Sequence, residues 1–126
     1  RAATFGAPIP NVLTGDPDPA PVLTKVPFLY YADAMEFKNL FGQPIEPGFV
    51  VDVTGVMEIK EQMLCCHASQ REWLRAHHNM DQYVQAMRQM SAERGKIIGA
   101  AYGEGFRQHL GHGYPQGRAI SELLNV

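Results

Sequence analysis

Apolar residues at helical spacing follow Thr54 in the middle of the chain. They recur at intervals of three and four, with charged and polar residues between them, which predicts an amphipathic helix running to Ser69 or somewhat beyond. Thr54 is the expected N-cap, and Glu58 lies in the first turns, where negative charge favours the helix dipole. The predicted apolar stripe consists of Val56, Ile59, Met63 and Cys66.

A second helix is predicted from Asn79 onward. Asn79 is an N-cap candidate with Gln82 in the capping-box position, and the helix is expected to stop at Gly95, directly after the cation of Arg94. Its apolar face consists of Tyr83, Val84, Met87 and Met90. The short apolar run 97–102 that follows fits either a helix or a strand, because its period does not separate the two.

Two strands are predicted ahead of these helices. Val26 to Ala32 is rich in aromatic and β-branched residues, with Pro27 at its start or on an edge. Phe49 to Val53 is almost continuously apolar, which is typical of a strand covered on both faces.

The two ends of the chain carry loop signals. Five of the nine prolines lie before Val26, so residues 1–25 are predicted to be a proline-rich loop, with Ala2 to Ala7 as the last turn of a helix. Gly103 to Gly117 holds five glycines and reads as loop, and Arg118 to Val126 is a short final helix. The predicted organisation is one domain or partial domain over residues 1–126, with strands and helices at 26–106 and a glycine-rich tail at 107–126.

Composition narrows the class of protein. A chain of 126 residues with 45% hydrophobic and 19% charged residues fits one globular domain. The net charge of -2, with dispersed basic residues, gives no footprint for nucleic acid or for an anionic membrane surface, and no apolar run reaches transmembrane length. The only cysteines, Cys65 and Cys66, are adjacent; reduced structural thiols fit best and favour a cytoplasmic location.

Several short motifs occur in a characteristic order. Val51-Asp52-Val53-Thr54 enters a helix that ends in His67-Ala68-Ser69-Gln70, and Tyr102-Gly103-Glu104-Gly105-Phe106 follows the second helix. In this order the motifs resemble the C-terminal half of the PIG-L/LmbE family of zinc-dependent de-N-acetylases, although alanine is commoner in the family at the position of Gly103. The resemblance spans about Val26 to Phe106. It implies an α/β fold: the C-terminal portion of a Rossmann-like three-layer sheet with helices on both faces.

The resemblance also implies a cofactor that this chain does not hold by itself. The family binds zinc through a His-Pro-Asp-Asp motif and a later His-x-x-His or His-Pro-Asp-His motif, both upstream of the region of resemblance, and the chain is expected to begin just after the second. His109 and His112 do stand three residues apart, but the neighbouring glycines argue against a helix and favour two exposed imidazoles over a metal pair. We therefore expect no metal ligand in this chain, and zinc held by a missing N-terminal half or a companion chain.

Five residues carry the expected site. The resemblance suggests Tyr83 as a catalytic hydroxyl that favours the oxyanion, with an amphipathic core tyrosine as the alternative. His67 and Arg71 are candidates for substrate binding at the rim of the groove; alternatively His67 bonds a carbonyl at the helix end, and Arg71 is solvated surface. Arg94 and Glu104 are expected to form a structural ion pair with each other.

The resulting functional hypothesis is the C-terminal segment of a metal-dependent hydrolase that removes the acetyl group from an N-acetylglucosamine-type substrate. This segment supplies the wall and packing of the site, and the isolated chain is expected to be inactive. The alternative is a non-catalytic oligomerisation or carbohydrate-binding module on the same fold. In either case exposed strand edges favour a homo-oligomer or a missing partner.

Overall fold

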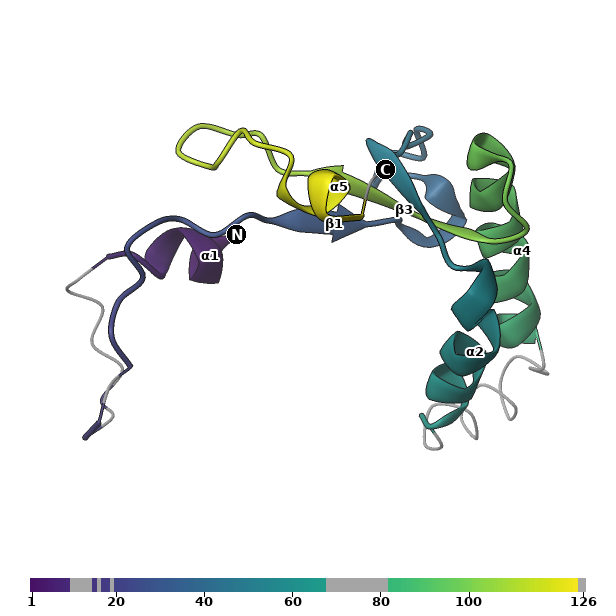
Figure 1. The fold of residues 1–126 in the computed structure, drawn as a ribbon, viewed down its shortest axis with the longest axis horizontal. Coiled ribbons are helices and arrows are strands. Elements are labelled where there is room, and N and C mark those ends of the chain that lie inside the picture. The colour runs from purple at the N-terminus through teal and green to yellow at the C-terminus, as the bar shows by residue number, and fades with distance from the viewer. Residues whose placement is uncertain (10–14, 16, 19, 68–81, 125–126) are drawn as a thin grey trace. The chain divides into compact units, whose positions relative to one another are not determined.

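A computed structural model describes residues 1–9, 15, 17–18, 20–67 and 82–124 (Figure 1). The chain divides into two compact units, one of residues 32–106 and one of residues 1–31 with 107–126. The fold is mixed α/β with a small antiparallel sheet in the strand order β1-β3-β2. No helix in the described ranges has the length and apolar character needed to cross a membrane.

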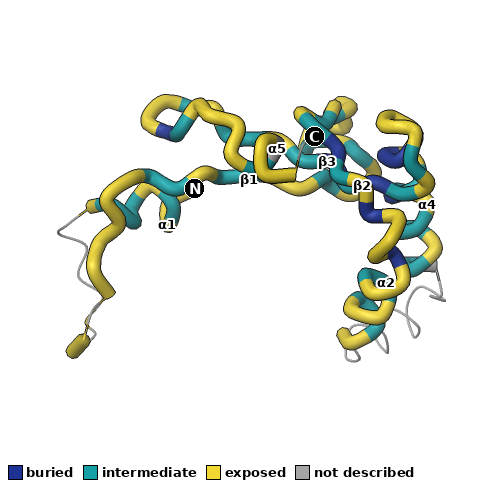
Figure 2. The backbone as a smooth tube through the Cα atoms, in the orientation of Figure 1, coloured by how far each residue is buried: buried dark blue, intermediate teal, exposed yellow. Residues whose placement is uncertain are grey.

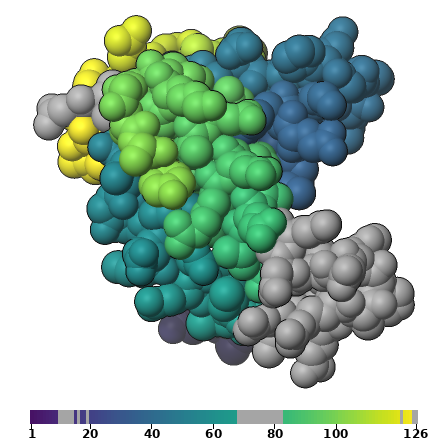
Figure 3. Space-filling view, turned by 90° about the vertical axis from the view of Figure 1, so that its right-hand side faces the viewer, coloured from purple at the N-terminus to yellow at the C-terminus, as the bar shows by residue number. Residues whose placement is uncertain are grey.

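The larger unit contains the elements that form the site. β2 (Phe49–Asp52) leads through a 3-10 turn (Thr54–Val56) into α2 (Met57–Cys65), and α4 (Gln82–Ile98) precedes β3 (Gly103–Gln108). β2 and β3 pair antiparallel, with Val50 opposite Gly105 and Asp52 opposite Gly103. α4 packs on β2, and it lies between the segment after β1 and α2 on the face shown in Figure 3.

The smaller unit contains the ends of the chain. α1 (Ala2–Gly6) and α5 (Ala119–Leu124) confirm the helices predicted there, and β1 (Tyr30–Ala32) leads toward the larger unit. β1 is only the last part of the strand predicted over Val26 to Ala32. Within this unit Tyr114 packs on Phe5, with ring centroids 5.8 Å apart, and its hydroxyl donates to the Arg1 carbonyl at 3.0 Å.

The strand predicted at Phe49 to Val53 is confirmed as β2. The prediction that it is covered on both faces is wrong. Val50 and Val53 are buried, whereas Asp52 is exposed. Thr54 is also not the side-chain cap of the helix. The Asp52 carboxylate accepts the Thr54 N–H at 2.8 Å, while the Thr54 hydroxyl oxygen accepts the Tyr102 N–H at 3.1 Å. The cap therefore comes from the strand end, and Thr54 joins β2 to the segment before β3.

The helix predicted after Thr54 is present as α2. The apolar stripe that was expected to be buried is instead exposed. Val56, Ile59 and Met63 are 49%, 57% and 66% exposed, and Met57 is the buried residue of the helix at 2% (Figure 2). Lys60 and Glu61 instead face α4, where they bond Ser91 and Arg88. Polar contacts rather than the apolar stripe therefore set the rotation of α2 against α4.

Glycines explain the two remaining errors. α4 passes through Gly95 and ends at Ile98, directly before Gly99, whose φ of +72° is the left-handed conformation common after a helix. Gly103 to Gln108, predicted as loop, is strand β3. A Cβ on Gly103 would lie 2.6 Å from Val50 Cγ1 and 3.0 Å from the Gly95 nitrogen. Gly95 and Gly103 are therefore required where helix and strand approach closely, not where the chain turns.

This contact predicts a steric penalty for Gly103→Ala. We expect a loss of about 1–3 kcal/mol in the free energy of unfolding, since the new methyl overlaps Val50 and the backbone of α4. The matched control is Gly55→Ala, where nothing lies within 4 Å of the added Cβ. Urea unfolding of both variants checks the prediction, and equal midpoints would contradict it.

The cap at Asp52 predicts a pH dependence. Hydrogen bonds from the Thr54 hydroxyl and then from its N–H lower the pKa of Asp52 below its ordinary value of 3.8. The folded state thus favours the ionised carboxylate, and this stabilisation is present above pH 3.8 and lost as the pH falls through the lowered pKa. Asp52→Asn keeps an acceptor oxygen but removes the charge. We therefore expect the urea midpoint of unfolding to fall less steeply in this variant as the pH is lowered from about 6 to 2. Glu46→Gln, at an exposed carboxylate of the same unit, is the control. If both variants change the pH dependence of the urea midpoint equally, the hydrogen bonds between Asp52 and Thr54 are not its cause.

Candidate functional site

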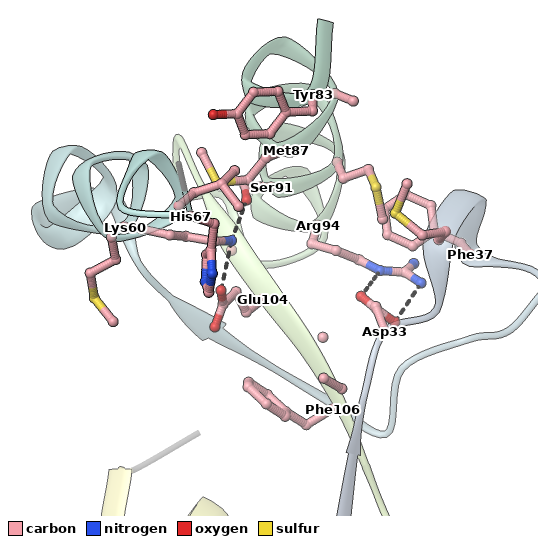
Figure 4. Close-up of a pocket in the computed structure, with 18 residues that line it drawn as sticks. Asp33, Phe37, Lys60, His67, Tyr83, Met87, Ser91, Arg94, Glu104 and Phe106 are labelled. Atoms are coloured by element: carbon pink, nitrogen blue, oxygen red, sulfur yellow. Dashed lines mark hydrogen bonds and ion pairs between the residues drawn. The ribbon is translucent and has the colours of Figure 1, made fainter. Parts of the chain in front are cut away.

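A cavity of about 590 Å³ lies within the larger unit. Its wall comes from α2, α4, β3 and the segment after β1, and Figure 4 shows the side chains that surround it. Most of the lining is apolar; the largest apolar contributors are Met35, Phe37, Met63, Met87, Met90 and Phe106. The charged groups of the wall are confined to two ion pairs.

The first pair joins Arg94 of α4 to Asp33, directly after β1. The guanidinium donates to both carboxylate oxygens, Nε to Oδ2 at 2.7 Å and Nη2 to Oδ1 at 3.0 Å, and the two side chains are only 8% and 13% exposed. Nη2 also donates to the Ile45 carbonyl at 3.0 Å, and the guanidinium carbon lies 3.8 Å from the centre of the Phe37 ring. Two-pronged pairing of this kind fixes orientation as well as charge.

A glycine makes room for this pair. A Cβ on Gly105 would overlap the Asp33 carboxylate, so a side chain at that position of β3 would displace the acid from Arg94. The Asp33 N–H also donates to the Gly105 carbonyl at 3.1 Å. Gly105 therefore positions Asp33 through both its backbone and its missing side chain.

The second pair joins Lys60 of α2 to Glu104 of β3. Lys60 Nζ lies 2.6 Å from Glu104 Oε1 and donates to the Ser91 hydroxyl at 2.9 Å, so one ammonium connects α2, α4 and β3. These side chains are partly exposed, and His67 lies beside them in Figure 4. The Lys60–Glu104 pair thus forms the more accessible side of the cavity.

These contacts correct the predicted Arg94–Glu104 ion pair. Arg94 pairs with Asp33, and Glu104 pairs with Lys60. The two residues project from different elements, and each has a nearer partner of opposite charge. Both residues form ion pairs, but neither Asp33 nor Lys60 was predicted as a partner. Asp33 carried a signal, since it directly follows a strand; Lys60 was assigned to the solvent side of α2.

The structure places two of the three remaining predicted site residues at the cavity. Tyr83 lines it from α4, and its hydroxyl lies 3.8 Å from Cys65 Sγ. His67 lines it from the end of α2, where its N–H donates to the Leu64 carbonyl at 3.3 Å. Arg71 lies outside the described residues, as do Ser69, Gln70, Trp73, His77, His78 and Asn79. Cys65 and Cys66 are free thiols, half-buried and exposed respectively.

Arg88 and Glu61 hold α4 and α2 together beside the cavity. Arg88 Nε donates to Glu61 Oε2 at 2.6 Å, and a second guanidinium nitrogen also contacts that oxygen. The bond to Glu61 and a further bond to the Tyr102 hydroxyl raise the pKa of Arg88 above its ordinary value. The Arg88 guanidinium therefore has a structural role, joining α4 to α2.

The exposed imidazole that was predicted at both positions is found at His112 but not at His109. The His109 ring packs edge-on against Tyr114, with centroids 4.3 Å apart, and its Nδ1 lies 3.1 Å from the Tyr31 hydroxyl, while His112 is exposed. More generally, the described part of the chain brings no three potential metal-ligating side chains together.

Comparisons with protein-family models, with curated proteins and with solved structures found no match. The functional argument therefore depends on the residues and geometry of this chain.

The buried pair predicts unequal costs for two charge-removing changes. Asp33→Asn leaves Arg94 without its counter-charge, and we expect a loss of about 3–5 kcal/mol in the free energy of unfolding. Glu36→Gln removes one partner of the exposed Lys38–Glu36 pair and should cost less than about 1 kcal/mol. Urea unfolding of the two variants decides between them; a similar small effect of both would show that the Arg94 pair is not a structural support.

Proposed function

We propose that this chain is the C-terminal part of a zinc-dependent N-deacetylase of the PIG-L/LmbE type, which removes the acetyl group from an N-acetylglucosamine-type substrate. One observation carries the proposal: described residues that the resemblance singles out between His67 and Phe106 line one cavity. They come from the end of α2, two turns of α4 and strand β3, and are His67, Tyr83, Arg94, Glu104 and Phe106.

The proposed complete fold is a Rossmann-like three-layer sheet, of which this chain is the later portion. Two features support it. β2 leads directly into α2, as in α/β units, and α2 presents Val56, Ile59 and Met63 to solvent, where a further layer would cover them. The partner that supplies this layer is an N-terminal half or a companion chain in the cytoplasm.

Within this proposal each polar group has a separate task. Tyr83 donates its hydroxyl to the oxygen of the acetyl carbonyl as that oxygen becomes negative. His67 contacts the substrate at the accessible side of the cavity, together with Arg71. The Arg94–Asp33 and Lys60–Glu104 pairs keep helices and strand in register, so that the donors stay in place.

The zinc of such an enzyme does not fit the donors of this chain. Catalytic zinc takes three protein ligands, usually His or carboxylate, and leaves a position open for water. Both carboxylates among the described lining residues are already paired with cations, Asp33 with Arg94 and Glu104 with Lys60, and the described residues hold no cluster of three ligands. We therefore assign the zinc ligands to the partner and no step of the chemistry on the metal to this chain.

A second candidate is a non-catalytic module for oligomerisation or carbohydrate binding. The exposed apolar positions of α2 favour it, since a second copy would bury them as well as a catalytic partner would. The reading frame upstream of Arg1 separates the candidates, because the enzyme requires both zinc motifs there or in a companion chain.

The enzyme proposal predicts a specific effect of Tyr83→Phe. In the assembled protein, made with the segment that carries the zinc motifs, loss of the hydroxyl should lower kcat by about 100-fold with little change in KM. Tyr31→Phe, at a tyrosine that does not line the cavity, should leave kcat unchanged. Acetate release from N-acetylglucosamine conjugates measures both. The 126-residue chain alone should bind no stoichiometric zinc and release no acetate; activity of that chain alone, or full activity of Tyr83→Phe, would refute the assignment.

A further inference from the structure

Among the described residues that line the cavity, the charges cancel. Among the lining residues Lys60 and Arg94 carry positive charge, and Asp33 and Glu104 carry negative charge, which gives two of each sign. Each cation already contacts its own carboxylate, Lys60 at 2.6 Å and Arg94 at 2.7 Å. Since these groups are occupied by one another, an ionic ligand group entering the cavity would lose its hydration without gaining an unpaired counter-charge.

The remaining surface suits an apolar group. Met87 of α4 and Phe106 of β3 lie on different sides of the cavity, with Phe37 on a third (Figure 4). Met90 of α4 also lines it, while Met35 and Met63 lie at more exposed positions. Methionine is unbranched and polarisable, so a lining rich in it adapts to flexible apolar groups of different shape. A volume of about 590 Å³ is in the range of small-molecule sites.

Polar groups that belong to neither ion pair also line the cavity. The Ser91 hydroxyl, the Tyr83 hydroxyl and the His67 ring all line the cavity, and Ser91 adjoins the Lys60–Glu104 pair. Such groups orient a hydroxyl or an amide without requiring that the ligand carry charge.

We infer that the cavity binds a neutral amphiphilic small molecule, with a flexible aliphatic group among the methionines and a hydroxyl or amide near Tyr83, Ser91 and His67. In the proposed enzyme this aliphatic group is the part of the substrate remote from the acetyl group, and this assignment rests on the proposed function. Binding itself needs neither zinc nor catalysis and is measured on the 126-residue chain alone.

The experiment uses 1-butanol, 1-pentanol and 1-hexanol as probes and follows the methionine methyl groups by NMR. Saturable shifts should occur at Met87 and Met90, and Met57, which is buried but does not line the cavity, provides the internal control. Affinity should rise about fourfold per added methylene. Hexanoate and hexylammonium should each bind at least about tenfold more weakly than 1-hexanol, because the ionic group must be desolvated.

A variant locates the site. Met90→Gln nearly preserves the shape of the side chain but adds a polar group, and should weaken 1-hexanol binding by about tenfold. Leu110→Gln, at an exposed leucine that does not line the cavity, should leave it unchanged. If Met90→Gln fails to fold, the methionine shifts of the unaltered chain and its relative affinities for 1-hexanol and the two ions still test the inference. Three results would overturn the inference: no saturable shift, equal shifts at Met57, or an ion that binds as tightly as 1-hexanol. Absence of deacetylase activity from the assembled, unaltered protein, by contrast, would refute the proposed enzyme and leave alcohol binding to the 126-residue chain intact.

Discussion

The buried pair between Arg94 and Asp33 is the contact on which the larger unit depends. It joins α4, about one turn before its end, to the residue after β1, and the same guanidinium holds the loop at Ile45 and lies over Phe37. A charge at this depth is tolerated only when fully compensated. The carboxylate must therefore reach Arg94, and it reaches it because β3 has no side chain at Gly105.

The same close approach explains why sequence reasoning failed where it did. Existence and order of the helices followed from periodicity, and the strand Phe49–Asp52 followed from its apolar run. Glycine, however, is used in turns and in close backbone contacts alike. Gly95, Gly103 and Gly105 were interpreted as turn signals, whereas each is needed because another atom occupies the place of its Cβ. Whether a glycine lies in a turn or in a close contact depends on the folded structure, so the sequence of a single chain does not distinguish the two.

The sequence predicted residues of the site but not the contacts between them. Motif order singled out His67, Tyr83, Arg94 and Glu104, and all four line the cavity. Their partners were not predicted, because pairing depends on how α2 is rotated against α4. The apolar stripe of α2 implied one rotation, and the contacts of Lys60 and Glu61 with α4 produce nearly the opposite one. A stripe identifies which residues prefer burial but not which neighbour buries them.

The distribution of charge then limits what this unit contributes to any chemistry. Hydrolysis of an amide needs groups that give or accept a proton and that stabilise a developing negative charge. In the cavity Lys60, Arg94, Asp33 and Glu104 are held in pairs that stabilise the fold, and withdrawing one of them for catalysis would leave its partner uncompensated. Tyr83, Ser91 and His67 also line the cavity and belong to neither pair, although the Ser91 hydroxyl accepts a hydrogen bond from Lys60. In the proposed enzyme a unit built in this way would orient and enclose a neutral ligand, and the strongly charged part of the reaction would belong to the residues that complete the site.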